Sequence, residues 1–152
     1  MSEDDKSAQA GGIAHEVLEA TLKKVREGAK LLDVATFAEG LIAEMGAKPA
    51  FPINISINDR AAHYTPEVDD SAVFSRGDLV KIDIGVHVDG YIGDIARSVA
   101  VGGGHKELIT AVEAALENAI NAIKPGAMSN EIGGIVEETI KGFGFLPVSN
   151  LT

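Results

Sequence analysis

Residues 81–99 read "KIDIGVHVDGYIGDIARSV" and decide the fold, because they are typical of a β-hairpin. Isoleucine and valine recur on both sides of an Asp-Gly dipeptide at 89–90. This dipeptide is a strong signal for a two-residue turn between antiparallel strands. We therefore predict one strand over residues 79–88 and a second over residues 91–101.

Each predicted strand carries an aspartate among its apolar residues, Asp83 in the first and Asp94 in the second. With Asp-Gly as the turn, Gly85 lies opposite Asp94, and Asp83 lies opposite Ala96. The two aspartates then become diagonal neighbours on one face, with their β-carbons roughly 7–8 Å apart or less. Because Gly85 has no side chain, we expect a small polar hollow flanked by two carboxylates.

Two interpretations of this carboxylate pair are open from the spacing alone. Like charges at short range repel, which raises one pKa, and a divalent cation reverses that cost. Two carboxylates across a hollow can hold a pair of metal ions about 3.5–4 Å apart. In the alternative, one aspartate faces solvent and the other pairs with Lys81 or Arg97.

Composition limits the other classes of function. The 152 residues suggest one domain, and the absence of cysteine excludes disulfides, thiolate zinc sites and a cysteine nucleophile. The formal net charge of −10 argues against a basic surface for nucleic acid. No apolar run approaches membrane-spanning length, so we predict a soluble cytoplasmic protein.

Helices and one further strand are predicted around the hairpin. The expected elements are helices over 13–27, 33–45 and 105–123, a further helix N-capped by Ser129, a strand over 51–58 and a loop over 59–78. Gly28 is expected at the C′ position of the first helix, and Gly46 is expected to end the second. Residues 1–8, which include the acidic run at 2–5, are expected to be disordered.

An internal repeat is visible at an offset of 98 residues, so that residues 14–51 correspond to 112–149. Matching pairs include Leu18 and Leu116, Gly28 and Gly126, Gly46 and Gly144, and Pro49 and Pro147. Agreement of both apolar spacing and glycine positions predicts a duplicated α+β fold. We expect an antiparallel sheet with helices on its outer face, and a second copy that stops near the start of its own sheet.

A histidine that is a candidate site residue lies in "NDRAAHYTP", residues 58–66. His63 falls between two predicted strands and just before a turn. By itself it is more typical of a loop histidine packed on Tyr64 than of a site residue. His87, on the Asp83 face, is either a metal ligand or an exposed strand residue.

"AFPINISINDRAAHYTP" (50–66) followed by "DLVKIDIGVHVDGYIGDIARSVAV" (78–101) closely resembles the type II methionine aminopeptidases, in their short, archaeal-like form. "HYTP" distinguishes type II from type I, and two aspartates separated by ten residues in a hairpin are common to the wider family. The resemblance runs from about residue 9 to the end of the chain. It implies the first half of the pseudo-two-fold, duplicated pita-bread fold of this peptidase family.

The resemblance also implies residue roles. Asp83 would be a bidentate ligand of one metal ion, and Asp94 would bridge two divalent ions, of Co, Mn, Fe or Zn. His63 would contact the substrate near the scissile peptide and stabilise the tetrahedral intermediate. Phe51 would line the pocket for the methionine side chain, although it could equally be a core residue.

Family members continue beyond this sequence with a Gly-His pair and two glutamates, so only two of five metal ligands are present here. The resemblance therefore implies part of an enzyme that removes the initiator methionine from nascent polypeptides. The chain alone is expected to be inactive, and its partners are expected to be a complementary C-terminal half or a second copy of itself. Two alternatives stay open, a non-catalytic binding paralogue of the same fold and a prolidase-like peptidase.

Overall fold

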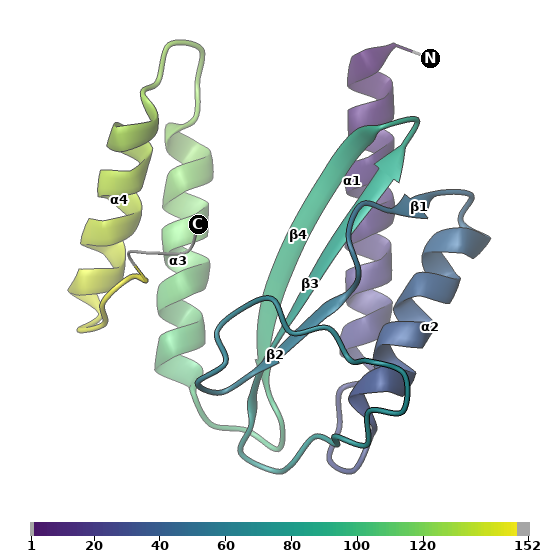
Figure 1. Cartoon of the computed structure of the whole chain (residues 1–152). Helices are drawn as coiled ribbons and strands as arrows, with labels where there is room; N and C mark the ends of the chain where they lie inside the picture. Colours follow the sequence, from purple (N-terminus) through teal and green to yellow (C-terminus); the bar gives the residue numbers. More distant parts are fainter. Residues whose placement is uncertain (1, 149–152) are drawn as a thin grey trace. The chain divides into compact units, whose positions relative to one another are not determined.

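A computed structural model describes residues 2–148 of the chain (Figure 1). The chain forms two compact units, which divide between Gly104 and His105. The first unit holds helices α1 (Glu3–Leu22) and α2 (Leu31–Glu44) and strands β1 (Lys48–Pro49), β2 (Asn54–Ile57), β3 (Leu79–Val88) and β4 (Tyr91–Ala100). The second unit holds helices α3 (Lys106–Ala122) and α4 (Ser129–Gly142). Among the described residues, no helix is long and apolar enough to cross a membrane.

The sheet of the first unit is antiparallel, and β3 is its central strand. Strand β4 pairs with one edge of β3 along its whole length, whereas β1 and β2 share the other edge. Helices α1 and α2 pack against the sheet (Figure 1). The predicted α+β class, with an antiparallel sheet covered by helices, is confirmed.

The hairpin has the register that the Asp-Gly turn predicts. Gly85 pairs with Asp94, and Asp83 pairs with Ala96. The two turn residues have positive φ angles of 51° and 89°. This is the conformation of a type I′ turn, whose twist suits antiparallel strands. The strand pattern therefore decides which side chains share a face.

The hydrophobic core lies between the helices and one face of the sheet. Its fully buried members include Val17 and Leu18 of α1, Ile42 of α2, Ile55 of β2, and Ile82, Ile84 and Val86 of β3. Burial of each such side chain stabilises the fold by about 1.5–3 kcal/mol. Because successive strand residues point to opposite faces, this core leaves Asp83 of β3 on the other face, together with Asp94 of β4.

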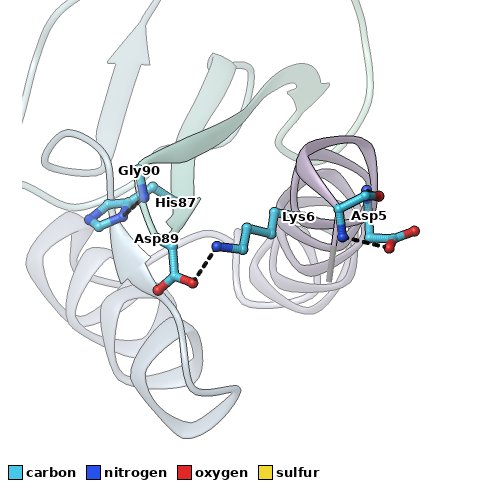
Figure 2. A network of polar contacts seen from close by, with 6 residues as sticks. Asp5, Lys6, His87, Asp89 and Gly90 are labelled. Atoms are coloured by element: carbon cyan, nitrogen blue, oxygen red, sulfur yellow. Dashed lines mark hydrogen bonds and ion pairs between the residues drawn. The ribbon is translucent and has the colours of Figure 1, made fainter.

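Helix α1 begins at Glu3, well before the predicted start at residue 13, so the prediction of disorder over 1–8 is wrong for the helical residues. Ser2 N-caps the helix through a capping box with the residue three positions later. The ammonium group of Lys6 pairs with Asp89 at 2.9 Å, in the turn of the hairpin (Figure 2). Capping and this tertiary contact both stabilise the first turns.

A close contact between backbones also holds α1 on β4. Gly93 is buried, and a β-carbon added there would lie 2.5 Å from the nitrogen of Gly11 and 2.6 Å from the carbonyl carbon of Ala10. Glycine is therefore required at this position. The small residues "AQAGG" at 8–12 allow the approach but show no helical stripe of large apolar residues, which explains the missed helix start.

The end of α1 also differs from the prediction. The helix ends at Leu22, not at residue 27, so Gly28 is not its C′ residue. Gly28 has a φ of 77° and donates its N–H to the carbonyl of Phe74 at 2.8 Å. This glycine therefore serves a turn that contacts the long loop before β3.

Other boundaries lie close to their predicted places. Helix α2 agrees with the prediction over 33–45, and Gly46 follows it with a φ of 75°. Strand β2 is shorter than the predicted 51–58, and residues 59–78 form the predicted loop. Helix α4 begins at Ser129, so its N-cap is Met128 and not Ser129 as predicted.

Similar local structure recurs in the two units at the offset of 98 residues. Helix α4 occupies the positions that correspond to α2, residue for residue. The hydrogen bonds that flank these helices recur as well: Ala29 N–H to Arg26 O matches Ala127 N–H to Lys124 O, and Ala47 N–H to Ile42 O matches Phe145 N–H to Ile140 O. The end of the sequence repeat, residue 149, lies outside the described residues.

Candidate functional site

Asp83 and Asp94 lie on the sheet face opposite the core. The residues on either side of Asp83, Ile82 and Ile84, are fully buried, so the Asp83 side chain points away from the helices. Asp94 is paired with Gly85 and is exposed. The two carboxylates therefore stand as diagonal neighbours on one open face.

The electrostatics of the pair are unfavourable without a cation. Asp83 is half-buried, and burial raises its pKa above the ordinary value. The negative charge of Asp94 raises it further, while Lys81 and His63 act in the opposite direction. A positive charge at this place would favour the ionised carboxylates.

The predicted polar hollow is wrong in one respect, because an aromatic ring fills part of it. A β-carbon added to Gly85 would lie 2.2–2.7 Å from ring atoms of Phe51. The backbone supports this contact, since Ala50 donates its N–H to the carbonyl of Gly85 at 2.9 Å. Phe51 is half-buried and rests beside the residue that faces Asp94.

The ion-pair alternative does not hold for Arg97. Its strand partner is the buried Ile82, which places Arg97 on the helix-covered face. There its guanidinium pairs with Glu19 of α1. Lys81 is the other cation of that alternative. Its charge lowers the pKa of Asp83, but burial and the charge of Asp94 outweigh it, and the pKa is raised.

His63 lies in the loop before β3, and its side chain is exposed. Its backbone is left-handed, with a φ of 60°. The charge of His63 is the smallest of the influences on the pKa of Asp83, and it lowers that pKa. The two residues that follow His63 connect its loop to the strand beside Asp83.

Two hydrogen bonds attach the His63 loop to β2. Ile55 donates its N–H to the carbonyl of Tyr64 at 2.7 Å. The Thr65 hydroxyl donates to the side-chain oxygen of Asn54 at 2.9 Å. Asn54 is the strand partner of Asp83, so the loop is fixed next to the half-buried carboxylate.

The structure gives His87 a different place. Its Nδ1 accepts the N–H of Gly90 at 3.3 Å, at the tip of the hairpin (Figure 2). Within residues 2–148, no three His, Asp or Glu side chains gather closely enough to hold a metal ion. Paired carboxylates suit a divalent cation chemically, but two of them alone are fewer groups than such an ion coordinates.

Sequence reasoning assigned no role to several residues around His63. Arg60 lies over the ring of Tyr64, with its guanidinium carbon 4.2 Å from the ring centre. The Tyr64 hydroxyl donates to the carboxylate of Asp70. The alternation of Asn54 with buried isoleucines indicated a polar face of β2, but no local signal connected it to the loop.

Comparisons of the sequence with family models and with known proteins point to the same family. Residues 5–151 match the model of metallopeptidase family M24. A methionine aminopeptidase of Thermococcus onnurineus is 50% identical over 100% of this chain, which spans 52% of that protein. A methionine aminopeptidase of Methanothermus fervidus is 49% identical over 97% of this chain, which spans 86% of that protein.

Solved structures give the same picture. Methionine aminopeptidase from Thermotoga maritima superposes with a TM-score of 0.89 at 28% identity, over 95% of this chain and 61% of that chain. Prolidase from Pyrococcus furiosus superposes with a TM-score of 0.82 at 34% identity, over 93% of this chain and 43% of that chain. The chain thus spans about half the length of the Thermococcus relative, and between two fifths and two thirds of these structures.

Proposed function

Because the chain belongs to metallopeptidase family M24, we propose that it is the N-terminal part of a methionine aminopeptidase, which removes the initiator methionine from nascent proteins. The observation that carries this proposal is one open sheet face that bears Asp83, Asp94 and, against Gly85, the ring of Phe51. Carboxylates suit a divalent metal, and an aromatic ring suits the thioether of methionine. The relatives support the pita-bread fold and this activity.

Asp83 and Asp94 would hold divalent cations in this enzyme, and we propose two ions of Co, Mn, Fe or Zn. Ions of this kind, when bound, polarise a peptide carbonyl and lower the pKa of a bound water. The chain contributes negative charge from a rigid strand pair, which fixes the separation of the two carboxylates. Because Asp94 is exposed, a metal ion held there could also bind ligand residues from the complementary half.

His63 and Phe51 would bind the substrate. His63 is exposed on an anchored loop beside Asp83, so its imidazole can reach a peptide held at the carboxylate pair. There it would donate a hydrogen bond to the oxygen on which charge develops. The half-buried ring of Phe51 would contact the methionine side chain.

A complementary half would supply the remaining ligands. Four apolar residues of α3 and its C-cap are exposed. At the offset of 98 they correspond to residues of α1 and of the turn after it that pack in or against the core: Val112 to Ala14, Leu116 to Leu18, Ile120 to Leu22 and Ile123 to Val25. We propose that the second copy of the repeat has its own sheet, which covers this face of α3. Because nascent chains arise in the cytoplasm, the enzyme would act there.

The decisive experiment compares the chain alone with the assembled enzyme. Residues 1–152 are expected not to hydrolyse a Met-Gly-type peptide, with or without added Co²⁺ or Mn²⁺, because two carboxylates cannot replace three further ligands. A mixture with a complementary C-terminal half is expected to release methionine, and Asp94→Asn is expected to abolish that release. Hydrolysis by the pure chain would overturn the ligand count.

A prolidase-like activity is the second candidate, because the prolidase from Pyrococcus furiosus is 34% identical to this chain. The assembled enzyme distinguishes the two, since a prolidase cleaves dipeptides with proline in second place and a methionine aminopeptidase does not need proline. A non-catalytic binding paralogue would cleave neither. The presence of Asp83, Asp94 and His63 together argues against that alternative.

A further inference from the structure

The loop that carries His63 is organised around the side chain of Tyr64. This side chain is half-buried, and its hydroxyl donates a hydrogen bond to the carboxylate of Asp70. The other oxygen of Asp70 accepts the N–H of Ala72 at 2.7 Å. The Arg60 guanidinium covers the ring of Tyr64 at 4.2 Å. Tyr64 is therefore held at both its ring and its hydroxyl.

His63, the residue just before Tyr64, has an unusual backbone conformation. Its φ of 60° lies in the left-handed region, which is unfavourable for a residue with a β-carbon. Such a conformation persists where surrounding contacts impose it. The next two residues, Tyr64 and Thr65, make the hydrogen bonds that fix this part of the loop to β2.

We propose that Arg60, Tyr64 and Asp70 are positioning residues, which hold the backbone of His63 in its left-handed conformation and so place its imidazole beside Asp83. This inference rests on the proposed function, in which His63 contacts the substrate. The three residues act through His63. Without the Tyr64–Asp70 hydrogen bond, Tyr64 can rotate, and the left-handed residue before it loses its support.

The charge states of the pair are consistent with this role at neutral pH. The hydrogen bond to Asp70 raises the pKa of Tyr64, so this bond is present below the ordinary tyrosine pKa and is lost as pH rises through the raised value. The hydrogen bond from Tyr64 lowers the pKa of Asp70, so it is lost as pH falls through the lowered value. Between these limits the set is intact.

The first test measures the backbone of His63 directly, in residues 1–152. Tyr64→Phe removes only the hydroxyl, and Asp70→Asn removes the charge while keeping an acceptor for Ala72. Scalar couplings and chemical shifts report the φ angle of His63 in each variant. Both variants are expected to lose the left-handed conformation in part of the population. Asp69→Asn, a change of an exposed neighbouring carboxylate, is the matched control and is expected to keep it.

The second test measures kinetics in the enzyme assembled with its complementary half. Tyr64→Phe and Asp70→Asn are expected to lower kcat roughly 10–100-fold, the effect of misplacing a reacting group by about 1 Å. Metal content is expected to stay unchanged, and KM is expected to change less than kcat. The double variant is expected to lose no more than either single variant, because both remove the same hydrogen bond.

The two tests separate failure of this inference from failure of the proposed function. An unchanged φ angle at His63 in both variants overturns the inference, whatever the assembled enzyme does. A changed φ angle with unchanged kcat also overturns it, because the position of the imidazole would then not affect the reaction. If the wild-type assembly cleaves no methionine peptide, the proposed function fails, and the φ measurement still decides whether the three residues position His63.

Discussion

Asp83 shows how a single residue affects the candidate site before any ligand binds. Its carboxyl is half-buried beside Asp94, and burial followed by that negative charge raises its pKa. The folded chain therefore binds a proton at Asp83 more tightly than the unfolded chain does. It follows that this carboxyl makes the metal-free fold less stable as pH rises from the ordinary aspartate pKa through the raised value.

We predict that Asp83→Asn raises the melting temperature of metal-free residues 1–152 by a few degrees at pH 7 and flattens its dependence on pH between 4 and 7. The neutral amide removes the repulsion from Asp94. Thermal unfolding with and without millimolar Mn²⁺ checks this, because any stabilisation by the ion should vanish in the variant. Asp59→Asn, at an exposed position, is the control. A lower melting temperature for Asp83→Asn without metal would contradict the assignment.

A second prediction at the residue scale concerns the contact between Gly85 and Phe51. A methyl group at position 85 would overlap the ring, so Gly85→Ala is expected to displace Phe51 and to cost about 1–3 kcal/mol in the free energy of unfolding. In the assembled enzyme it should also weaken binding of methionine peptides. Gly40→Ala, in an exposed turn of α2 with open space around it, is expected to stabilise by up to about 1 kcal/mol.

The interpretation of Gly85→Ala depends on what the added methyl group meets. A Phe51→Ala background removes the ring, so the cost of Gly85→Ala should become small there. Urea unfolding of the two single variants and the double variant measures this coupling. If the cost is the same in both backgrounds, the clash is not with the ring.

At the scale of elements, the sequence predicted most of what the structure contains. The hairpin register followed from its Asp-Gly turn, and α2 and α3 followed from their apolar periods. The predicted bounds of α1, 13–27, lie too far toward the C-terminus. Leu22 and Val25 continue the apolar stripe of the helix beyond its true end, whereas its N-terminal turns contain small residues in place of such a stripe. Besides the N-cap and the Lys6–Asp89 pair, the contact of Gly11 with Gly93 stabilises this part of the helix. Gly93 is distant in sequence, so this contact leaves no periodic signal.

This contact gives a prediction for the helix–strand interface. Gly93→Ala is expected to destabilise the chain by at least as much as Gly85→Ala, because the added methyl group would meet backbone atoms of Ala10 and Gly11 that cannot rotate away. Urea unfolding followed by circular dichroism measures the change. Hydrogen exchange should increase first in the N-terminal turns of α1. Unchanged stability would mean that helix and strand can separate without cost.

At the scale of the whole molecule, the candidate site was only partly predictable from sequence. The positions of Asp83 and Asp94 followed from strand period and turn, because both lie in one hairpin. A role for His63 at this site was predicted only from the resemblance to a family. A loop has no regular period from which the direction of a side chain can be predicted. The role of Asp70 could not be predicted, because its partner is six residues away in irregular backbone.

The repeat carries the last prediction. Leu18 is fully buried in the first unit, whereas its counterpart Leu116 is 57% exposed, and so are Ile120 of α3 and Ile123, the C-cap of this helix, at 58% and 66%. Strand β4 also pairs on only one side with a described strand. An apolar helix face and a free strand edge both favour association with another chain. We therefore expect residues 1–152 to bind the complementary half tightly or, without it, to form homodimers or aggregates.

Charged residues on α3 test this expectation without disturbing the core. Leu116→Lys with Ile120→Lys should leave the unfolding of residues 1–152 nearly unchanged, because both side chains are exposed, but should weaken association at least tenfold by burying unpaired charge. Val68→Lys, at an exposed apolar residue of the loop, is the matched control and should associate like wild type. Sedimentation at several concentrations measures each variant. A cooperatively folded wild-type monomer at high concentration, or normal association of the double variant, would show that the α3 face needs no cover.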